Sequence, residues 1–308
     1  MTIREFKKRY GTQSACLKAL LELRMPADRL CFNCRAPIDK HYHLLHGDTE
    51  RSKTGYLCRL CLGHFHPMVN SIFDHSHVPI EDWFMVIYEM LTCRNAVSAR
   101  EIHFKYGYTY KTVYGMMDDI RKAMGKALDF NFENTVVEVD ESYVRTGTKG
   151  LGRHFKSKTG RGSEPNTSVL VIAERNGVVK LYVIPSTGAD DILPIIDKTI
   201  PRTTKIYTDD WKAYNRLRAM GYEHAVVNHS DYHYVTGSAS TNTAENVFSN
   251  LKRAIRGTYR NVSEGRLQAY LNEIAFRLSF REEEDYGFSR LLGTLTPLAD
   301  HYSKKSAA

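Results

Sequence analysis

Residues 237–259, GSASTNTAENVFSNLKRAIRGTY, contain a helix that combines an ordinary apolar face with two charged groups. From Thr243 onward the apolar residues recur at the i, i+3, i+4, i+7 spacing of an amphipathic helix, at Ala244, Val247, Phe248, Leu251 and Ile255. Glu245 and Lys252 are seven residues apart, so both project from roughly the same side of that helix, about 10 Å from each other. The stretch therefore presents one side chain suited to a metal ion beside one suited to a phosphate.

A structural interpretation of the same residues is equally open from this stretch alone. Asn242 followed three residues later by Glu245 fits a capping arrangement, in which the glutamate reaches back to the amide of the N-cap residue. Lys252 would then be a solvated surface lysine. The rest of the chain has to decide between the two interpretations.

Composition places the chain among soluble globular proteins with a polyanionic partner. The 308 residues suffice for two or three domains, and 42% hydrophobic with 25% charged residues is a globular balance. The net charge of +8 favours binding to a polyanion. The apolar runs are interrupted by charges and residues 1–10 are too polar for a secretory signal, so no membrane span and a reducing, cytoplasmic location are predicted. The six cysteines are then expected as thiols or metal ligands rather than disulfides.

Four of these cysteines form two C-x-x-C pairs, Cys31/Cys34 and Cys58/Cys61, separated by twenty-three residues. Four thiolates close a tetrahedral site, so the spacing predicts a zinc ribbon in which structural Zn²⁺ stabilises a segment with little core of its own. The alternatives are unrelated cysteines or a redox pair. The two remaining cysteines, at 16 and 93, are expected to be buried and unpaired.

Helices are predicted on both sides of Gly107. A helix opened by Pro79 runs to about Arg94, and a short helix from about residue 98 is joined through Gly107 to a longer one that begins near Thr109. Two helices joined by a short glycine-containing turn suit a helix-turn-helix that offers Lys111 to DNA, with Tyr110 and Tyr114 beside it. A plain helical bundle is the alternative.

The pattern changes to strands near residue 134. Residues 136–144 alternate, which puts Glu138, Asp140 and Ser142 on one face and the structural Glu141 on the other. A glycine-rich basic loop follows at 145–166, suited to a phosphate backbone or serving as a solvated linker. The later elements are strands at 168–173 and 179–184 joined by an Asn-Gly turn, a helix at 190–199, a strand at 205–210, a helix at 211–220 and a strand at 224–229. After the helix at 243–255, Ser263 caps another, and the tail from Arg281 is expected to be irregular.

Hairpin strands followed by alternating helices and strands are the order expected of a ribonuclease-H-like α/β domain. Three acids hold matching places in it, because Asp140 lies in the first strand, Asp209 ends a later strand and Glu245 opens the helix. Converging carboxylates suit two Mg²⁺ ions that catalyse phosphodiester chemistry. Asp210 is the alternative to Asp209, and His229 and Asn242 are candidates to position phosphate or water, or else hydrogen-bonded loop residues.

Over nearly its full length the chain resembles the bacterial insertion-sequence DDE transposases that join an N-terminal zinc ribbon to an ISXO-like catalytic domain. The resemblance rests on the four cysteines, on Val139-Asp-Glu-Ser-Tyr143, on Tyr207-Thr-Asp-Asp-Trp-Lys-Ala-Tyr214, and on Thr241-Asn-Thr-Ala-Glu-Asn-Val-Phe-Ser-Asn-Leu-Lys-Arg253 with Gly257-Thr-Tyr259. It implies Asp140, Asp209 and Glu245 as ligands of Mg²⁺ or Mn²⁺ and Lys252 as a contact to the DNA end. It also favours Asp209 over Asp210.

The expected function is transposition, in which the ends of an insertion sequence are cleaved and their 3′ ends are joined to target DNA. The expected DNA-binding residues are Lys111, Arg153, Lys156, Lys158, Arg161, Lys252, Arg253 and Arg256. The terminal inverted repeats and the target are the DNA partners, and a homo-oligomer that works near the nucleoid is expected to bring two ends together. A DNA-binding regulator without catalysis and a nuclease of the same fold are the alternatives. The expected boundaries are 1–30 for N-terminal helices, 31–78 for the zinc ribbon, 79–130 for the helix-turn-helix segment, 131–282 for the catalytic domain and 283–308 for the tail.

Overall fold

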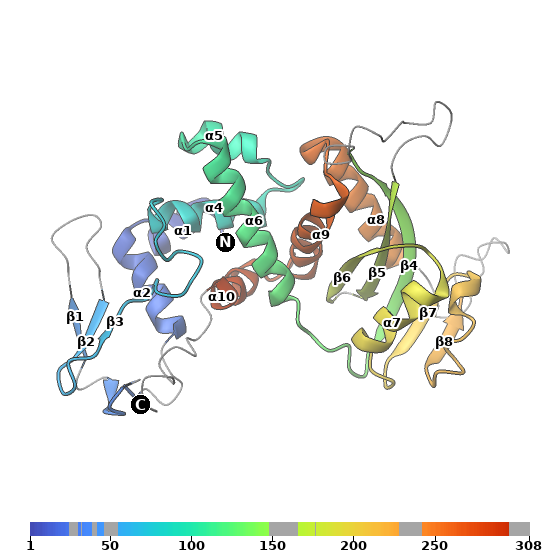
Figure 1. The fold of residues 1–308 in the computed structure, drawn as a ribbon, viewed down its shortest axis with the longest axis horizontal. Coiled ribbons are helices and arrows are strands. Elements are labelled where there is room, and N and C mark those ends of the chain that lie inside the picture. Colours follow the sequence, from blue (N-terminus) through green and yellow to red (C-terminus); the bar gives the residue numbers. More distant parts are fainter. Residues whose placement is uncertain are drawn as a thin grey trace.

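The computed structural model describes residues 1–24, 30–31, 33–38, 42–45, 55–147, 166–175, 177–227 and 242–295. In Figure 1 a helical region with a small sheet lies on one side and a larger sheet with its own helices on the other. No helix in these ranges is both long and apolar enough to cross a membrane.

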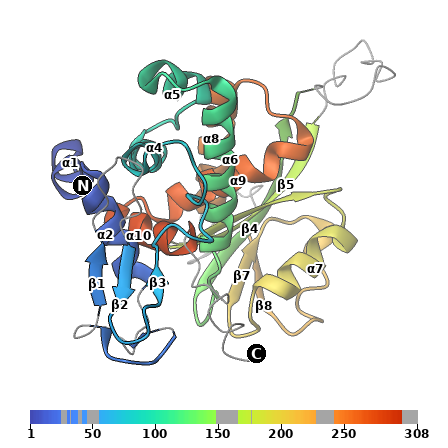
Figure 2. The same cartoon turned by 60° about the vertical axis from the view of Figure 1, so that its left-hand side comes forward.

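The N-terminal region begins with helices α1 (Ile3–Tyr10) and α2 (Gln13–Arg24). A small antiparallel sheet follows, with strand order β1-β2-β3, made of β1 (Tyr42–Leu45), β2 (Gly55–Cys58) and β3 (His64–Phe65). In Figure 2 it lies beneath α1 and α2. Among the described residues of this region, the buried apolar cluster consists of Cys31, Ala36 and Cys58, with Cys61 packed against it.

The next three helices include the predicted helix–turn–helix pair. They are α4 (Ile80–Thr92), α5 (Ala99–Tyr106) and α6 (Tyr110–Ala127). Ser98 and Glu101 form a capping box at the start of α5, and Thr109 caps α6. Gly107 ends α5 at φ 74°, a left-handed conformation that glycine adopts without steric cost. The two predicted helices and their glycine turn are confirmed.

The larger sheet is mixed and has the strand order β6-β5-β4-β7-β8. Its strands are β4 (Val136–Arg145), β5 (Asn166–Glu174), β6 (Val179–Ile184), β7 (Lys205–Thr208) and β8 (Glu223–Val226). The first three form an antiparallel meander, and β7 and β8 run parallel to β4. This is the predicted arrangement of hairpin strands followed by strands that alternate with helical segments.

Alternation along the strands covers the sheet on both faces. Leu170 and Ile172 of β5 pack toward helix α7 (Ala189–Thr199), whereas Val169 and Val171 pack toward the opposite helices. These are α8 (Asn242–Ala254), a π-helical turn at Ile255–Tyr259 and α9 (Glu264–Ser279). The core on their side continues into α4 and α6, so the N-terminal helices and the sheet share one hydrophobic core.

The predicted helix at 211–220 is wrong. The structure has a 3-10 turn at Lys212–Tyr214 followed by further turns, closed by i→i−3 bonds such as Leu217 to Tyr214. The apolar residues Trp211, Tyr214, Leu217 and Met220 recur every three positions, which matches three residues per turn better than 3.6.

The irregular tail predicted from Arg281 is also wrong for its first part. Residues Glu284–Leu295 form helix α10, whose buried side chains repeat at helical spacing, at Phe288, Leu291, Leu292 and Leu295. This helix packs against α2, α4 and α6. The apolar stripe of this helix comes directly after the five charged residues 281–285.

Candidate active site

The four predicted zinc ligands come together. The Sγ atoms of Cys31, Cys34, Cys58 and Cys61 all lie within 4.8 Å of one another. Sγ of Cys31 is 3.8 Å from Sγ of Cys61, and Sγ of Cys34 is 3.6 Å from Sγ of Cys58. A tetrahedron with Zn–S bonds of 2.3 Å has edges of about 3.8 Å, whereas a disulfide requires about 2.0 Å. The distances fit four ligands around one zinc ion, and the alternative of four unrelated cysteines is wrong.

The backbone around the thiols has the form of two metal-binding knuckles. The amide of Asn33 donates to Sγ of Cys31, and the amide of Gly63 donates to Sγ of Cys61, each at 3.4 Å. Such bonds stabilise thiolates and fix their direction toward a metal.

Parallel pairing brings Asp140 and Asp209 to one place in the large sheet. Strands β4 and β7 pair Val137 with Ile206 and Glu138 with Tyr207. If the same register is continued two residues beyond the last pair, Asp140 falls opposite Asp209, which directly follows β7, and both carboxylates act on the neighbouring Glu141. Both side chains are partly buried. The adjacency of the first two predicted metal ligands therefore follows from sheet register.

The pKa values of Glu141 and Tyr214 are raised, in part by the negative charges of Asp140 and Asp209. Burial raises the pKa of Glu141 to about 7; a hydrogen bond from Tyr214 opposes the increase, and the charges of Asp209 and Asp140 add to it. Burial, with Glu141, Asp140 and Asp209 nearby, likewise raises the pKa of Tyr214 well above its usual value. Glu141 bonds to Tyr214 in the core on the α7 side, as strand alternation predicts.

Glu138 anchors α8 on β4, a role that the sequence did not reveal. This fully buried carboxylate accepts hydrogen bonds from the amides of Thr243 and Ala244 at 2.7 and 3.1 Å, and from the hydroxyl of Thr243 at 3.1 Å. It also pairs with Arg175 at 2.9 Å. A carboxylate at a helix N-terminus satisfies free amides and complements the helix dipole. The only signal was an acid among valines on the Asp140 face.

The capping interpretation of Asn242 and Glu245 finds no support. Glu138 caps the first turn of α8, and no bond joins Asn242 to Glu245 in the part of the chain that the structure describes. Glu245 is exposed. It stands in the turn that Glu138 anchors, and its carboxylate is left to solvent.

The side chain of Lys252, on α8, contacts β4 at Ser142, two residues beyond Asp140. Its Nζ donates to Oγ of Ser142 at 2.7 Å and is 5.8 Å from the ring centre of Phe248. The four residue-to-residue steps along the strand from Glu138 to Ser142 and the nine steps along the helix from Thr243 to Lys252 both span about 13 Å. Helix α8 therefore runs along β4, past Asp140, and Lys252 is a bonded, partly buried group rather than a solvated one.

The three carboxylates do not form a closed cage. Within the described ranges, the cysteine cluster is the only group of three or more potential ligands whose ligand atoms all lie within 4.8 Å. Asp140 and Asp209 are neighbours by register, and Glu245 lies in the first turn of α8, which Glu138 anchors on β4. This open arrangement leaves room for water and for the oxygens of a substrate between the carboxylates and a metal ion.

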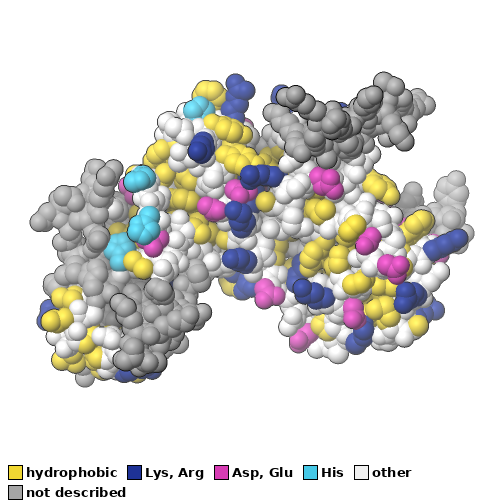
Figure 3. Space-filling model, in the orientation of Figure 1, with side chains coloured by type: hydrophobic (Ala, Val, Ile, Leu, Met, Phe, Trp, Pro, Cys, Tyr) yellow, Lys and Arg dark blue, Asp and Glu magenta, His cyan; other side chains and the backbone are white. Residues whose placement is uncertain are grey.

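The structure describes only some of the predicted DNA-binding residues. Lys111, Arg253 and Arg256 are exposed, on the first turn of α6, on α8 and on the π-helical turn. Outside the described residues lie Arg153, Lys156, Lys158, Arg161 and His229. In Figure 3 the Lys and Arg side chains follow α5 and α6 down the middle of the molecule, mixed with acidic ones.

The helix-turn-helix pair also presents aromatic residues, of which the sequence indicated only some. Phe104 is 71% and Tyr110 is 53% exposed. Arg100 lies over the ring of Phe104 at 5.5 Å. They line a hollow of about 990 Å³ between α5, α6 and the π-helical turn, which Arg260 borders. Exposed rings beside arginines suit stacking on nucleic-acid bases.

Comparison with known proteins agrees with the motifs. Residues 134–279 match the family described as ISXO2-like transposase domain. An uncharacterized protein in transposable element ISH50 of Halobacterium salinarum is 29% identical over 281 residues, covering 88% of this chain and 92% of the relative. An uncharacterized transposase-like protein of Haemophilus influenzae is 26% identical over 105 residues, covering 33% of this chain and 84% of that protein.

Solved structures give a weaker likeness. A pre-cleavage Mos1 transpososome aligns with a TM-score of 0.31 and 9% identity, covering 70% of this chain and 79% of the other. The Mos1 strand transfer complex aligns with a TM-score of 0.30 and 12% identity, covering 72% and 76%. Values this low do not establish a common fold.

Proposed function

We propose, from the premise that residues 134–279 belong to the ISXO2-like transposase domain family, that the protein cleaves the ends of an insertion sequence and joins their 3′ ends to target DNA. The observation that carries the proposal is the parallel register of β4 and β7, which brings Asp140 opposite Asp209, while Lys252 of α8 bonds to Ser142 on the same strand as Asp140. Two phosphoryl transfers at one such edge need no side chain with a tuned pKa as a general base.

Asp140, Asp209 and Glu245 would hold Mg²⁺ or Mn²⁺. The donor set fits, because hard cations prefer carboxylate oxygens and retain several waters. The raised pKa of Glu141 supports the fit, since it reflects, besides burial, carboxylate charges that a divalent cation would offset. When bound, the ions supply Lewis-acid stabilisation of the attacking and leaving oxygens.

The chain's own residues would orient the DNA. Lys252 Nζ has three donors, of which Ser142 occupies one, so a phosphate of the DNA end can bind at the same ammonium. Glu138 holds the first turn of α8 and thereby sets the position of Glu245 relative to Asp140. Glu141 and Tyr214 fix the opposite side of the strand.

The zinc ribbon and the helix-turn-helix segment would recognise the inverted repeats at the element ends. The exposed Lys111 and Tyr110 at the start of α6 support this role, since recognition helices contact bases with their N-terminal residues. We retain 31–78, 79–130 and 131–282 as the zinc-ribbon, recognition and catalytic units. Two element ends brought together imply at least two copies of the chain on DNA.

The test separates binding, nicking and joining on labelled element-end DNA with Mg²⁺ or Mn²⁺. Asp140→Asn, Asp209→Asn and Glu245→Gln should each abolish joining and leave end binding nearly intact. Asp210→Asn is the matched control, because this exposed neighbour should be dispensable. Joining by the triple variant would refute the proposal. Wild-type nicking without joining would identify a nuclease, and binding without either reaction would identify a regulator.

A further inference from the structure

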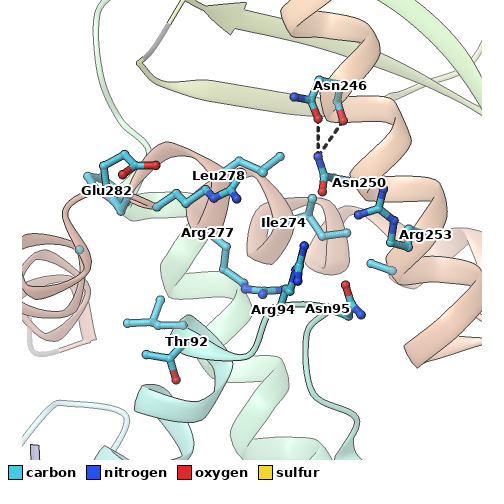
Figure 4. Close-up of a pocket in the computed structure, with 15 residues that line it drawn as sticks. Thr92, Arg94, Asn95, Asn246, Asn250, Arg253, Ile274, Arg277, Leu278 and Glu282 are labelled. Carbon is cyan, nitrogen blue, oxygen red and sulfur yellow. Dashed lines mark hydrogen bonds between the residues drawn. The ribbon is translucent and has the colours of Figure 1, made fainter. Parts of the chain in front are cut away.

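A pocket of about 530 Å³ lies where α4, α8 and α9 meet, and it is rich in arginine. Four arginines line it: Arg94 after α4, Arg253 on α8, Arg277 on α9 and Arg281 just beyond α9. Glu282 is the one acid among its lining residues. Figure 4 shows labelled side chains from all three helices around this space. Four like charges around one hollow repel one another unless an anion binds between them.

One arginine of the pocket wall has a buried donor without a partner in the described part of the chain. Nε of Arg277 is buried, and no acceptor among the described residues lies within hydrogen-bonding distance of it. Nη2 of the same side chain donates to the carbonyl of Cys93, so the guanidinium is held in place while Nε is left over. A buried polar group without a partner is costly, and a bound anion is one explanation for its presence.

The walls of the pocket are fixed before any ligand binds. The loop that carries Arg94 is bonded from two sides, since Arg277 donates to Cys93 and the Thr258 hydroxyl donates to the carbonyl of Asn95 at 2.6 Å. The next residue, Ala96, has φ 70°, a strained value for a residue with a Cβ. On the facing helix the Asn250 amide is held by the carbonyl and side chain of Asn246. These bonds hold the Arg277 guanidinium and the backbone from which Arg94 projects, which lowers the entropy lost when an anion binds.

The pocket adjoins the face of α8 that carries the candidate active site. Three lining residues of α8 have the spacing i, i+4 and i+7 and form a stripe: Asn246, Asn250 and Arg253. This stripe is rotated by about 100° around the helix axis from the side that carries Glu245 and Lys252. A strand that contacts Lys252 thus meets the pocket on crossing α8. Arg94 belongs to the segment that leads from α4 into the helix-turn-helix pair, so the pocket joins the recognition helices to the catalytic unit.

We propose that this pocket binds one phosphate of a DNA strand, held between Arg94, Arg253 and Arg277. The proposal rests on the proposed function only for the identity of the polyanion as DNA. Its ligand chemistry, a phosphate group among guanidinium and amide donors, follows from the pocket itself.

The test is the salt dependence of binding to a fluorescein-labelled DNA duplex of mixed sequence, measured without Mg²⁺. The Arg94→Ala/Arg253→Ala double variant removes two exposed side chains and should fold. If both hold one phosphate, the slope of log K against log salt should fall by about 0.9, and affinity should weaken about tenfold at fixed salt. The matched control is Arg4→Ala/Arg216→Ala, which removes two exposed arginines outside the pocket and should leave the slope unchanged.

Three results would overturn the proposal. The first is an unchanged salt slope in the Arg94→Ala/Arg253→Ala variant. The second is a decrease of the slope by about 1.8, which means that the two arginines hold two separate phosphates, and the third is an equal decrease of the slope in the control variant. Inorganic phosphate against chloride at constant ionic strength separates the sources. If phosphate stabilises the wild type and not the double variant while the DNA slope is unchanged, the pocket takes free phosphate and the DNA assignment is wrong. Because no joining is scored, a decrease of about 0.9 supports the pocket even in a protein that fails the strand-transfer test.

Discussion

The cysteine cluster of the small sheet and the carboxylates of the large sheet are two candidate metal sites built in opposite ways. The four Sγ atoms already lie within 4.8 Å of one another, and in the described part of that segment the buried apolar cluster consists of Cys31, Ala36 and Cys58. Asp140, Asp209 and Glu245 are borne by a sheet and a helix with large cores, and they do not converge to that extent. A structural site takes the place of a core and is closed, whereas a site for chemistry stands on a core and stays open to substrate.

Removal of zinc should have the largest effect, because it breaks the first site alone. Structural zinc contributes about 10–16 kcal/mol of apparent folding free energy in zinc-finger peptides, far more than the small apolar cluster here. We expect a chelator, or Cys58→Ser, to unfold the region around residues 31–66 and leave β4–β8 folded. Amide hydrogen exchange resolves the two regions.

The control for this experiment is Cys93→Ala, which changes a cysteine outside the cluster. It should leave the exchange rates of β2 unchanged. Amide protection of β1–β3 that survives chelation would contradict a structural metal.

A second prediction contrasts two acids on one face of β4. Glu138 is buried, accepts hydrogen bonds from the amides of α8 and pairs with Arg175. Asp140, in contrast, belongs to the open carboxylate site. Glu138→Gln should lower the free energy of unfolding by about 1–3 kcal/mol, because an NH₂ group replaces one of the oxygens that accept from the α8 amides and the negative charge at the helix N-terminus is lost. Asp140→Asn should lower it little or raise it, since it removes charge from an acidic edge.

Urea denaturation with zinc present measures both variants under the same conditions. Equal losses of stability would mean that Asp140 is as structural as Glu138, and the contrast between closed and open acids would fail. Thr243→Val serves as a partial control, because it removes one hydroxyl bond to Glu138 and keeps the two amide bonds.

Magnesium should stabilise the open site alone. A cation that binds only the folded state at one hundred times its Kd adds about 2.7 kcal/mol to the free energy of unfolding. We expect this increase for the wild type and for Asp210→Asn, and its loss in Asp140→Asn/Asp209→Asn. The measurement is denaturation across a Mg²⁺ titration, and an equal increase in the double variant would place the cation elsewhere.

The sequence predicted more of the first site than of the second. The C-x-x-C spacing predicted all four cysteine ligands, because the ligands of a ribbon lie close to one another along the chain. The alternation of β4 predicted the faces of Asp140 and Glu141, and the helical spacing of α8 predicted that Glu245 and Lys252 share a side. These are local periodicities, which is why they could be derived from the sequence.

The features that escaped prediction depend on contacts between distant segments. Glu138 bonds to amides 105 and 106 residues away, and nothing near it in sequence shows that it caps a helix. Arg94 from the loop after α4 and Arg277 from α9 line one pocket although they are far apart in the sequence. The helix at 284–295 had a visible apolar stripe, but only its packing on α2, α4 and α6 shows why a stripe next to several charges is buried.

A decrease in pH should lower the stability of the large sheet through His224, which belongs to neither candidate metal site. His224 on β8 is buried, and its Nε2 is 2.9 Å from Oγ1 of Thr208. Burial, with Arg218 nearby, lowers its pKa below the usual 6.5. Between these two pKa values the unfolded chain binds the extra proton and the folded chain does not, so this contribution to stability is complete above pH 6.5 and is lost as the pH falls through the folded pKa.

We expect protection of the β7 and β8 amides to decrease below pH 6.5 in the wild type and to change less in His224→Gln, which retains a donor toward Thr208. This effect should be the smallest of the four. Protonation of the thiolates also releases zinc in acid, so the β1–β3 amides should lose protection equally in both proteins. If the variant alters the pH response of the small sheet, the two regions are coupled. If it leaves the response of β8 unchanged, His224 does not titrate as its burial requires.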